Sequence, residues 1–265
     1  MDNPLVSVII PTYNNTRTID RCLKSIKDQS YNNIEIIVVD NNSTDDTKQI
    51  AKKYTDKVYN KWPERSAQRN YWVSKASWKY VLVHDSDIYF HKDTVKEAVE
   101  LMQNSDYSAL ILPEKSIWEW FWVKVKAFER SFYMWNDYME AIRFFDKQKY
   151  DEIWGYDENL TWPEDWDLTI RFREAWLKIG RTKNMLLHDE WHIDIFWSSK
   201  KKQYYWKDMF EKYSKKWPEY FSKQMSFFVR FPINKILKKW LRHPILFNCM
   251  IFMKGLEYFN SKRYK

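Results

Sequence analysis

The sequence contains very little glycine, few cysteines and no long apolar run. Only 3 of its 265 residues are glycine, where an average protein has about 7%. The two cysteines, Cys22 and Cys249, exclude a disulfide framework and favour a reducing compartment. No apolar stretch reaches the roughly 20 residues that span a bilayer, and the N-terminal segment lacks the pattern of a secretory signal. We therefore expect a cytoplasmic protein without a transmembrane helix.

Tryptophan, by contrast, is abundant, with 16 residues. Several of them stand where turn geometry calls for glycine, as Trp78 does between a predicted helix and a predicted strand. One hypothesis is that the gene reads UGA as glycine and that tryptophan was written in its place. The other is a natural protein that uses aromatic side chains at a membrane or glycan surface, which leaves the glycine deficit unexplained. The positions that fit the first hypothesis are Trp62, Trp72, Trp78, Trp118, Trp120, Trp135, Trp154, Trp162, Trp176, Trp191, Trp197 and Trp206.

The net charge of +8 is concentrated in the last quarter of the chain. Such a gradient predicts an anionic partner surface. No zinc-finger spacing or RNA-binding motif accompanies it, so we expect a membrane surface rather than nucleic acid. The apolar stretch 244–253 follows a cluster of Lys and Arg and is too short to cross a bilayer. It indicates either an interfacial segment on an anionic leaflet or a helix packed on the rest of the protein.

Aliphatic runs alternate with amphipathic stretches through the first half of the chain. Such alternation predicts an α/β fold with a mostly parallel sheet and right-handed crossovers. We expect one catalytic domain over residues 1–200 and a basic, aromatic, helical tail over 201–265. Strands are predicted over 6–10, 34–39, 58–59, 80–83 and 110–112, and helices over 16–29, 44–54, 66–76 and 164–176.

Two carboxylates follow the third strong strand. Asp85 and Asp87 flank Ser86 directly after the aliphatic run 80–84. Carboxylate oxygens bind Mg²⁺ and Mn²⁺, which also take oxygens from substrate phosphates. Ligands of α/β sheets bind at the carboxyl ends of the strands. The pair therefore indicates a divalent-cation site, although acidic residues also serve there as loop and helix-capping groups.

Five segments, in this order and spacing, resemble the family 2 glycosyltransferases of GT-A fold. They are 6–14 (VSVIIPTYN), 36–45 (IIVVDNNSTD), 68–70 (QRN), 85–87 (DSD) and 164–168 (EDWDL). The resemblance implies an enzyme that moves a sugar from a nucleotide diphosphate donor to an acceptor hydroxyl, with inversion at the anomeric carbon. It implies a nucleotide-binding half over 1–110 and an acceptor half over 111–200. The Gln-x-x-Arg-Trp motif of processive members is missing, which favours transfer of a single sugar to a glycan or lipid-linked acceptor.

The resemblance also implies a set of donor-binding residues in the loops after the strands. Asp40 would bond to the base, or these polar residues would only form turns and caps. Arg69 would bind a phosphate in bidentate fashion, or lie solvated on its helix. The donor-binding set is Pro11, Thr12, Tyr13, Asn14, Asp40, Asn42, Arg69, Asn70, Asp85 and Ser86.

A metal site follows from the same resemblance. Asp87 would bind Mn²⁺ or Mg²⁺ directly, while Asp85 would contact the ribose or a metal-bound water. A histidine after the base helix would complete the shell; His188 and His192 both stand there, and His192 is the predicted ligand. The cation would neutralise charge on the departing diphosphate.

An inverting transfer needs a base that takes the proton of the acceptor hydroxyl. Asp165 is the candidate, with Glu164 and Trp166 beside it as substrate-binding residues. The alternative is that the acids at 164, 165 and 167 only complement the positive end of the helix that they begin. Three acids in four residues exceed that need.

Other activities fit these residues less well. Nucleotidyl transfer would need a glycine-rich phosphate loop where the segment 11–14 stands, and a phosphatase of the Asp-x-Asp-x-Thr kind would need threonine in place of Tyr89. The non-enzymatic alternative is a membrane-surface binding protein with an inactive transferase fold. The presence of both Asp87 and Asp165 argues against it.

Overall fold

The computed structural model describes residues 3–60, 65–75, 79–117, 119–160, 162–191, 193–196, 198–200 and 209–261. The chain divides into two compact units. Unit 1 comprises residues 1–114, 141–159 and 164–188, and unit 2 comprises residues 115–140, 160–163 and 189–265. This division differs from the boundary expected at residue 200, because the segment 115–140 groups with the C-terminal helices rather than with the sheet.

Unit 1 is built on a seven-stranded sheet of order β3-β2-β1-β4-β8-β6-β9. Its inner strands β1, β2 and β4 are parallel, and β8 is antiparallel to both of its neighbours. This mostly parallel arrangement confirms the predicted α/β class. The strands are β1 (Val6–Thr12), β2 (Ile34–Asp40), β3 (Val58–Asn60), β4 (Tyr80–Val83), β6 (Ala109–Ile111), β8 (Ile142–Asp146) and β9 (Ile179–Arg181).

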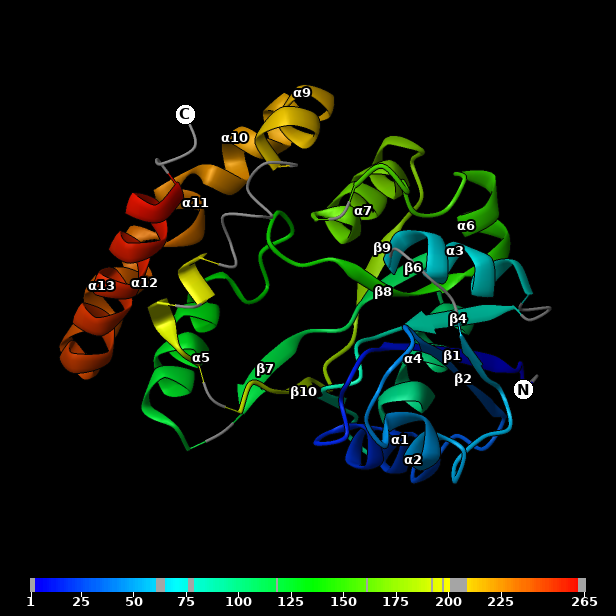
Figure 1. The fold of residues 1–265 in the computed structure, drawn as a ribbon. Coiled ribbons are helices and arrows are strands. Elements are labelled where there is room, and N and C mark those ends of the chain that lie inside the picture. The colour runs from blue at the N-terminus through cyan, green and yellow to red at the C-terminus, as the bar shows by residue number, and fades with distance from the viewer. Residues whose placement is uncertain are drawn as a thin grey trace. The chain divides into compact units, whose positions relative to one another are not determined.

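Helices cover both faces of this sheet. The predicted apolar row of α1, namely Ile19, Leu23 and Ile26, is buried, which confirms the amphipathic pattern that predicts this helix. Helices α1 (Ile19–Lys27) and α4 (Thr94–Gln103) lie on one face, and α3 (Arg65–Lys75), α6 (Lys147–Glu152) and α7 (Glu164–Glu174) lie on the other (Figure 1). The short helix α2 (Thr47–Ala51) packs against α1.

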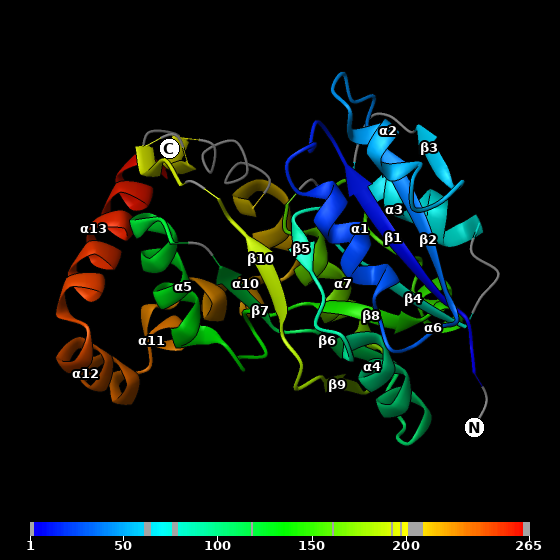
Figure 2. The same cartoon turned by 90° about the horizontal axis from the view of Figure 1, so that it is seen from below.

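A short antiparallel pair brings a late segment of the chain to the residues after β4. Strand β5 (Ile88–Tyr89) lies beside β10 (Leu186–Asp189) in Figure 2. The two strands pair, and His188 lies opposite Ile88. Strand β7 (Glu114–Ile117) begins at the last residue of the first segment of unit 1. These connections place His188 and Glu114 in the same unit as the Asp85–Asp87 segment.

Unit 2 is mostly helical in its described part. Helix α5 is central, and its apolar residues Val125, Phe128 and Phe132 pack with Met250 and Met253 of α13. No described helix is long and apolar enough to cross a membrane. The elements are α5 (Phe121–Tyr133), a π-helical turn (Met209–Tyr213), α9 (Ser214–Lys216), α10 (Pro218–Met225), α11 (Phe227–Arg230), α12 (Ile233–Arg242) and α13 (Pro244–Ser261).

Four tryptophans have left-handed backbone conformations. Their φ angles are 69° at Trp135, 67° at Trp154, 57° at Trp176 and 45° at Trp191. Among the described residues other than glycine, only these four and two asparagines have positive φ. Asparagine tolerates this region, whereas a bulky residue there is an outlier. All four belong to the set that fits the glycine hypothesis, which stays a prediction. Trp62, Trp78, Trp118, Trp197 and Trp206 lie outside the described residues.

Candidate active site

The loops after β1 and β4 are joined through Ser86. Its hydroxyl oxygen accepts hydrogen bonds from Thr12 Oγ1 at 3.0 Å and from Asn15 Nδ2 at 2.6 Å. Its backbone oxygen accepts one from Thr18 Oγ1 at 3.0 Å. The parallel pairing of β1 with β4 brings these loops to one edge of the sheet. The carboxylates that flank Ser86 are therefore held beside the loop predicted to bind the donor.

The loop after β2 joins the same edge. Thr12 and Asp40 are partners in the pairing of β1 with β2. Asn14, with a φ of 43°, donates its backbone N–H to Ser43 Oγ at 2.8 Å and accepts from Thr44 N at 2.8 Å. Tyr13 is exposed at the tip of its loop. The structure thus brings the predicted nucleotide-binding residues of the two loops together, Pro11, Thr12, Tyr13, Asn14, Asp40 and Asn42.

Asp40 has a structural role that the sequence left as an alternative. It is fully buried, and both of its carboxylate oxygens accept hydrogen bonds from Ser43, from the backbone N–H at 2.7 Å and from the hydroxyl. Lys48 Nζ lies 3.5 Å away. Asp40 therefore holds the turn after β2, and base recognition by this residue stays a prediction.

Arg69 links the strand-end acids to the acids of α7. Its Nη1 donates to Glu164 Oε1 at 3.0 Å and to Asp165 Oδ1 at 3.1 Å, and its Nη2 donates to Asp85 Oδ1 at 3.3 Å. The side chain is only 1% exposed, so the solvated-arginine interpretation is wrong. Phosphate binding by Arg69 stays a prediction, because the hydrogen bonds described for its guanidinium group are to carboxylates.

Two further charged residues belong to this cluster, and sequence reasoning missed both. Arg143, from β8, donates to Asp165 Oδ2 at 2.6 Å and lies 3.4 Å from Glu114 Oε1. Glu114 Oε2 lies 3.5 Å from His188 Nδ1. Neither residue stands in a recognisable motif; the only local signal is a charged residue within or next to an apolar strand.

Asp87 and His188 lie at the other end of the same cluster. His188 Nε2 is 3.4 Å from Asp87 Oδ2. Asp87 Oδ1 is buried and has no hydrogen-bond partner. His192, the predicted metal ligand, lies outside the described residues. Among the residues that are described, His188 is therefore the histidine brought to Asp87.

The donor set at Asp87 fits a divalent cation that shares its shell with a ligand. A carboxylate oxygen without a partner and an imidazole nitrogen are both suitable ligands for Mn²⁺. Within the described part of the chain, no group of three or more His, Cys, Asp or Glu residues is arranged to hold a metal ion by itself. Such a cation would need further oxygen ligands from phosphate groups and water, which is the usual situation for Mg²⁺ at phosphate sites.

The three acids at the start of α7 have different environments. Glu164 is 3% exposed and bonded to Arg69. Asp167 is fully buried and pairs with Arg171 Nε at 2.8 Å. The side chain of Asp165 is 20% exposed. Of the three, Asp165 is thus the one that a second substrate can reach. Trp166 is half-buried on the same helix.

Asn70 ties α3 to the loop before α7. Its Nδ2 donates to the backbone oxygen of Tyr156 at 2.8 Å, and its Oδ1 accepts from Tyr156 N at 2.8 Å and from the Tyr150 hydroxyl. Gly155 has a φ of 62°, and a Cβ there would lie 2.7 Å from Asn70 Oδ1. This close approach requires glycine. Substrate binding by Asn70 stays a prediction beside this structural role.

His84 is an uncharged residue beneath the cluster. It is fully buried at the end of β4, and its Nδ1 accepts a hydrogen bond from Asp85 N–H at 2.9 Å. Burial, reinforced by the Arg143 guanidinium, lowers the pKa of His84 from 6.5 to about 4. The imidazole is therefore neutral at pH 7 and fixes the backbone from which Asp85 projects.

Comparisons with known proteins agree with this arrangement. The family described as "Glycosyl transferase family 2" matches residues 7–157, more than half of the chain. Poly(ribitol-phosphate) beta-N-acetylglucosaminyltransferase TarS of Staphylococcus aureus is 33% identical over 120 residues, which are 42% of this chain and 21% of TarS. The uncharacterized glycosyltransferase MG060 of Mycoplasma genitalium is 31% identical over 139 residues, 47% of this chain and 46% of that protein. The matches thus span less than half of these relatives.

Solved structures share the fold. Mannosyltransferase PcManGT from Pyrobaculum calidifontis, in complex with GDP-Man and Mn²⁺, superposes with a TM-score of 0.68 at 15% identity, covering 98% of this chain and 86% of that one. S. aureus TarS 1-349, in complex with UDP-GlcNAc, superposes with a TM-score of 0.57 at 18% identity, covering 97% and 89%. These likenesses confirm the expected GT-A fold. Together with the family match over residues 7–157, they show that the chain belongs to glycosyl transferase family 2.

Proposed function

We propose that this protein transfers a single sugar from a nucleotide diphosphate donor to an acceptor hydroxyl, with inversion at the anomeric carbon. The observation that carries the proposal is the contact of Arg69 with both Asp85 and Asp165. One guanidinium group joins the predicted donor site to the predicted base. A donor held by the strand-end loops would then lie next to the group that activates the acceptor.

The donor site is the edge of the sheet formed by the loops after β1, β2 and β4. These loops offer hydroxyl, amide and backbone groups that can bond to a base and a ribose. Solved relatives of the same fold hold UDP-GlcNAc and GDP-Man. They support a nucleotide-sugar donor and leave open which base and which sugar this chain selects.

A divalent cation, Mg²⁺ or Mn²⁺, is proposed at Asp87 and His188. The described cluster contains five carboxylates, Asp85, Asp87, Glu114, Glu164 and Asp165, and only two guanidinium groups, Arg69 and Arg143. A diphosphate would add further negative charge. When bound, the cation would supply Lewis-acid stabilisation of the departing diphosphate. Neighbours with bound Mn²⁺ support this choice of cofactor.

Asp165 is proposed as the general base. Its carboxylate accepts hydrogen bonds from Arg69 and Arg143, which orient it and also weaken it as a base. An acceptor hydroxyl becomes more acidic as its oxygen bonds to the anomeric carbon, so a carboxylate of modest basicity can take the proton. The hydroxyl would approach the exposed part of the side chain. The acceptor is proposed to be a glycan or a lipid-linked sugar.

Calorimetry against UDP-, GDP- and dTDP-sugars, with and without Mn²⁺, tests the donor proposal. We expect one nucleotide class to bind and its affinity to depend on the cation. Release of the nucleoside diphosphate from that donor, followed by chromatography, tests the reaction. If the protein binds none of these donors in the presence of Mn²⁺, the proposed function is contradicted.

A further inference from the structure

Residues 226–256 of unit 2 contain no acidic side chain. They contain six cationic ones, Arg230, Lys235, Lys238, Lys239, Arg242 and Lys254. Helix α12 carries four of these together with five large apolar residues. The cations recur at i, i+3, i+4 and i+7, and the apolar residues occupy the other side of the helix. This amphipathic pattern normally directs the apolar side towards a protein core.

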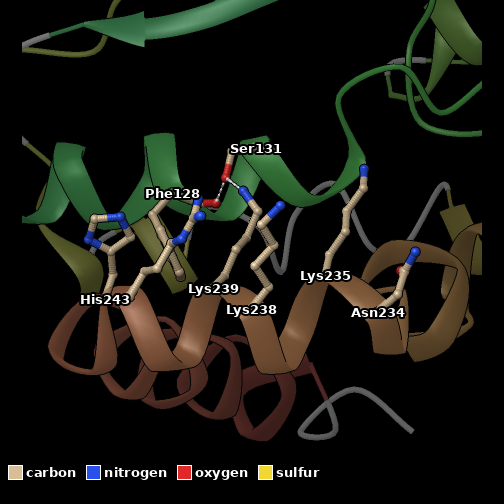
Figure 3. A pocket seen from close by; sticks show the side chains of 8 residues that line it. Phe128, Ser131, Asn234, Lys235, Lys238, Lys239 and His243 are labelled. Carbon is tan, nitrogen blue, oxygen red and sulfur yellow. Dashed lines mark hydrogen bonds between the residues drawn. The ribbon is translucent and has the colours of Figure 1, made fainter.

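In unit 2 the basic side of α12 faces the neighbouring helix instead. Lys235 Nζ donates to the backbone oxygen of Phe132 at 2.9 Å, and Lys239 Nζ donates to Ser131 Oγ. Figure 3 shows these lysines pointing from α12 towards α5, where they line a pocket with Phe128 and His243. Lys239 Nζ also lies 4.8 Å from the centre of the Phe132 ring. The basic side of α12 thus lies against α5, and of the apolar residues Ile236 also packs on the core of unit 2.

The apolar side of α12 is left largely uncovered. Ile233, Leu237 and Leu241 are 69%, 61% and 66% exposed, and their i, i+4, i+8 spacing forms one stripe along the helix. Trp240, beside this stripe, is 43% exposed. Soluble proteins rarely expose a contiguous row of large aliphatic side chains, and such a row marks an interaction surface.

Helix α13 adds further exposed apolar residues. Ile245 at its start is 69% exposed, and Phe252 and Phe259 are 52% and 71% exposed. The opposite side of α13 is buried, because Met250 and Met253 pack against α5. The arrangement of α13 is therefore that of an ordinary surface helix with an unusually apolar outer face.

Charge decides which partner this surface fits. A second copy of the chain would bring no acidic side chain from residues 226–256 to this contact, so it would leave the six cations uncompensated. An anionic phospholipid leaflet attracts them electrostatically. Ten residues of α12 extend only about 15 Å, so the helix is far too short to span a bilayer. Tryptophan is favoured at the level of the lipid headgroups.

We propose that α12 lies in the interface of an anionic phospholipid bilayer, with Ile233, Leu237 and Leu241 inserted among the acyl chains. Lys238 and Arg242 line the pocket beside α5 and remain exposed, so their charges add to the electrostatic attraction of unit 2 to the leaflet. Sugar transfer is not needed for this contact. Membrane binding and the proposed catalytic activity can therefore be tested separately.

Co-sedimentation with lipid vesicles tests the proposal. The full chain is mixed with phosphatidylcholine vesicles that contain about 30% phosphatidylglycerol, or with pure phosphatidylcholine vesicles. We expect the parent to sediment with the anionic vesicles and to remain in the supernatant with the neutral ones. I233S/L237S/L241S should weaken sedimentation at least about tenfold, because three inserted aliphatic side chains are lost. W154S/W176S, which replaces exposed apolar residues of unit 1, should sediment like the parent.

A charge-reversal pair keeps the test valid if the triple variant is poorly folded. K238E/R242E should lose binding to anionic vesicles. K52E/K53E makes the same charge change at exposed residues of unit 1 and should bind these vesicles much more tightly than K238E/R242E does. Circular dichroism checks that each variant is folded. The proposal is overturned if the parent fails to sediment with anionic vesicles, or if folded I233S/L237S/L241S binds them like the parent. It is also overturned if light scattering shows that the parent is a dimer and that, among the variants, only I233S/L237S/L241S disrupts the dimer.

Discussion

Arg69 and Glu164 are 95 positions apart in the chain, and their side chains meet at 3.0 Å in a buried ion pair. The same guanidinium group reaches Asp165 and Asp85. From Asp165 the contacts continue through Arg143 and Glu114 to His188 and Asp87. The predicted base and the predicted metal ligand therefore belong to one connected set of charged groups.

Removal of the Arg69 charge should destabilise unit 1. Arg69→Met removes the guanidinium group that pairs with the buried carboxylate of Glu164, and breaking a buried pair in this way costs about 3–5 kcal/mol. Urea unfolding measures the loss. The double variant Arg69→Met/Glu164→Met removes both charges and should recover much of it. Equal stability of Arg69→Met and the parent would mean that the pair is not buried as described.

Removal of the Asp87 carboxylate should abolish cation-dependent donor binding. The side chain is 36% exposed and one of its oxygens has no hydrogen-bond partner, so Asp87→Ala should fold like the parent. Calorimetry with Mn²⁺ and the preferred nucleotide sugar measures the effect. Asp56→Ala, at an exposed position of unit 1, is the matched control and should bind normally. Unchanged binding by Asp87→Ala would remove Asp87 from the metal site.

His84 predicts a pH dependence of stability. Burial, with a contribution from Arg143, lowers its pKa to about 4, below the usual 6.5, so the unfolded chain binds more protons between these values. The stabilisation is complete above about pH 6.5 and is lost as the pH falls towards 4, by roughly 3 kcal/mol in total. Urea unfolding over this range measures the slope. His84→Asn should flatten it; an equally steep slope in that variant would assign the effect to other groups.

The left-handed tryptophans predict an unusual gain of stability. Trp135, Trp154, Trp176 and Trp191 have positive φ angles that glycine adopts without strain. Replacing all four by glycine should raise the melting temperature, since each forced conformation costs on the order of 1–3 kcal/mol. Trp240→Gly, in a regular helix, should lower it. UGA codons at the four positions would establish the recoding, whereas UGG codons would refute it.

Most of the fold could be predicted from the sequence because its signals are local. The apolar row of α1 and the aliphatic runs of β1, β2 and β4 have the periods of a helix and of buried strands. Sequence reasoning could not assign α5 to unit 2, because α5 is held there by contacts with α13 more than 100 residues later.

The candidate site was predicted only in part, for a related reason. Asp85, Asp87 and Asp165 stand in short motifs that reveal them. Arg143 and Glu114 lie in or beside strands without a motif. Arg143 joins the site because β8 pairs with β4, and Glu114 because it follows β6, which pairs with β8. The inward orientation of Arg69 likewise depends on α7, which follows it by about 90 residues.

The comparison of Asp165→Asn with the parent tests the central claim most directly. The substitution keeps the shape of the side chain and removes its ability to accept a proton. With the preferred nucleotide sugar and Mn²⁺, donor affinity should persist while turnover falls by about 10²–10⁴. Asp106→Asn, at an exposed position paired only with Lys178, should retain full turnover. Full turnover by Asp165→Asn would contradict the assignment of Asp165 as the base, and with it the mechanism proposed for this protein.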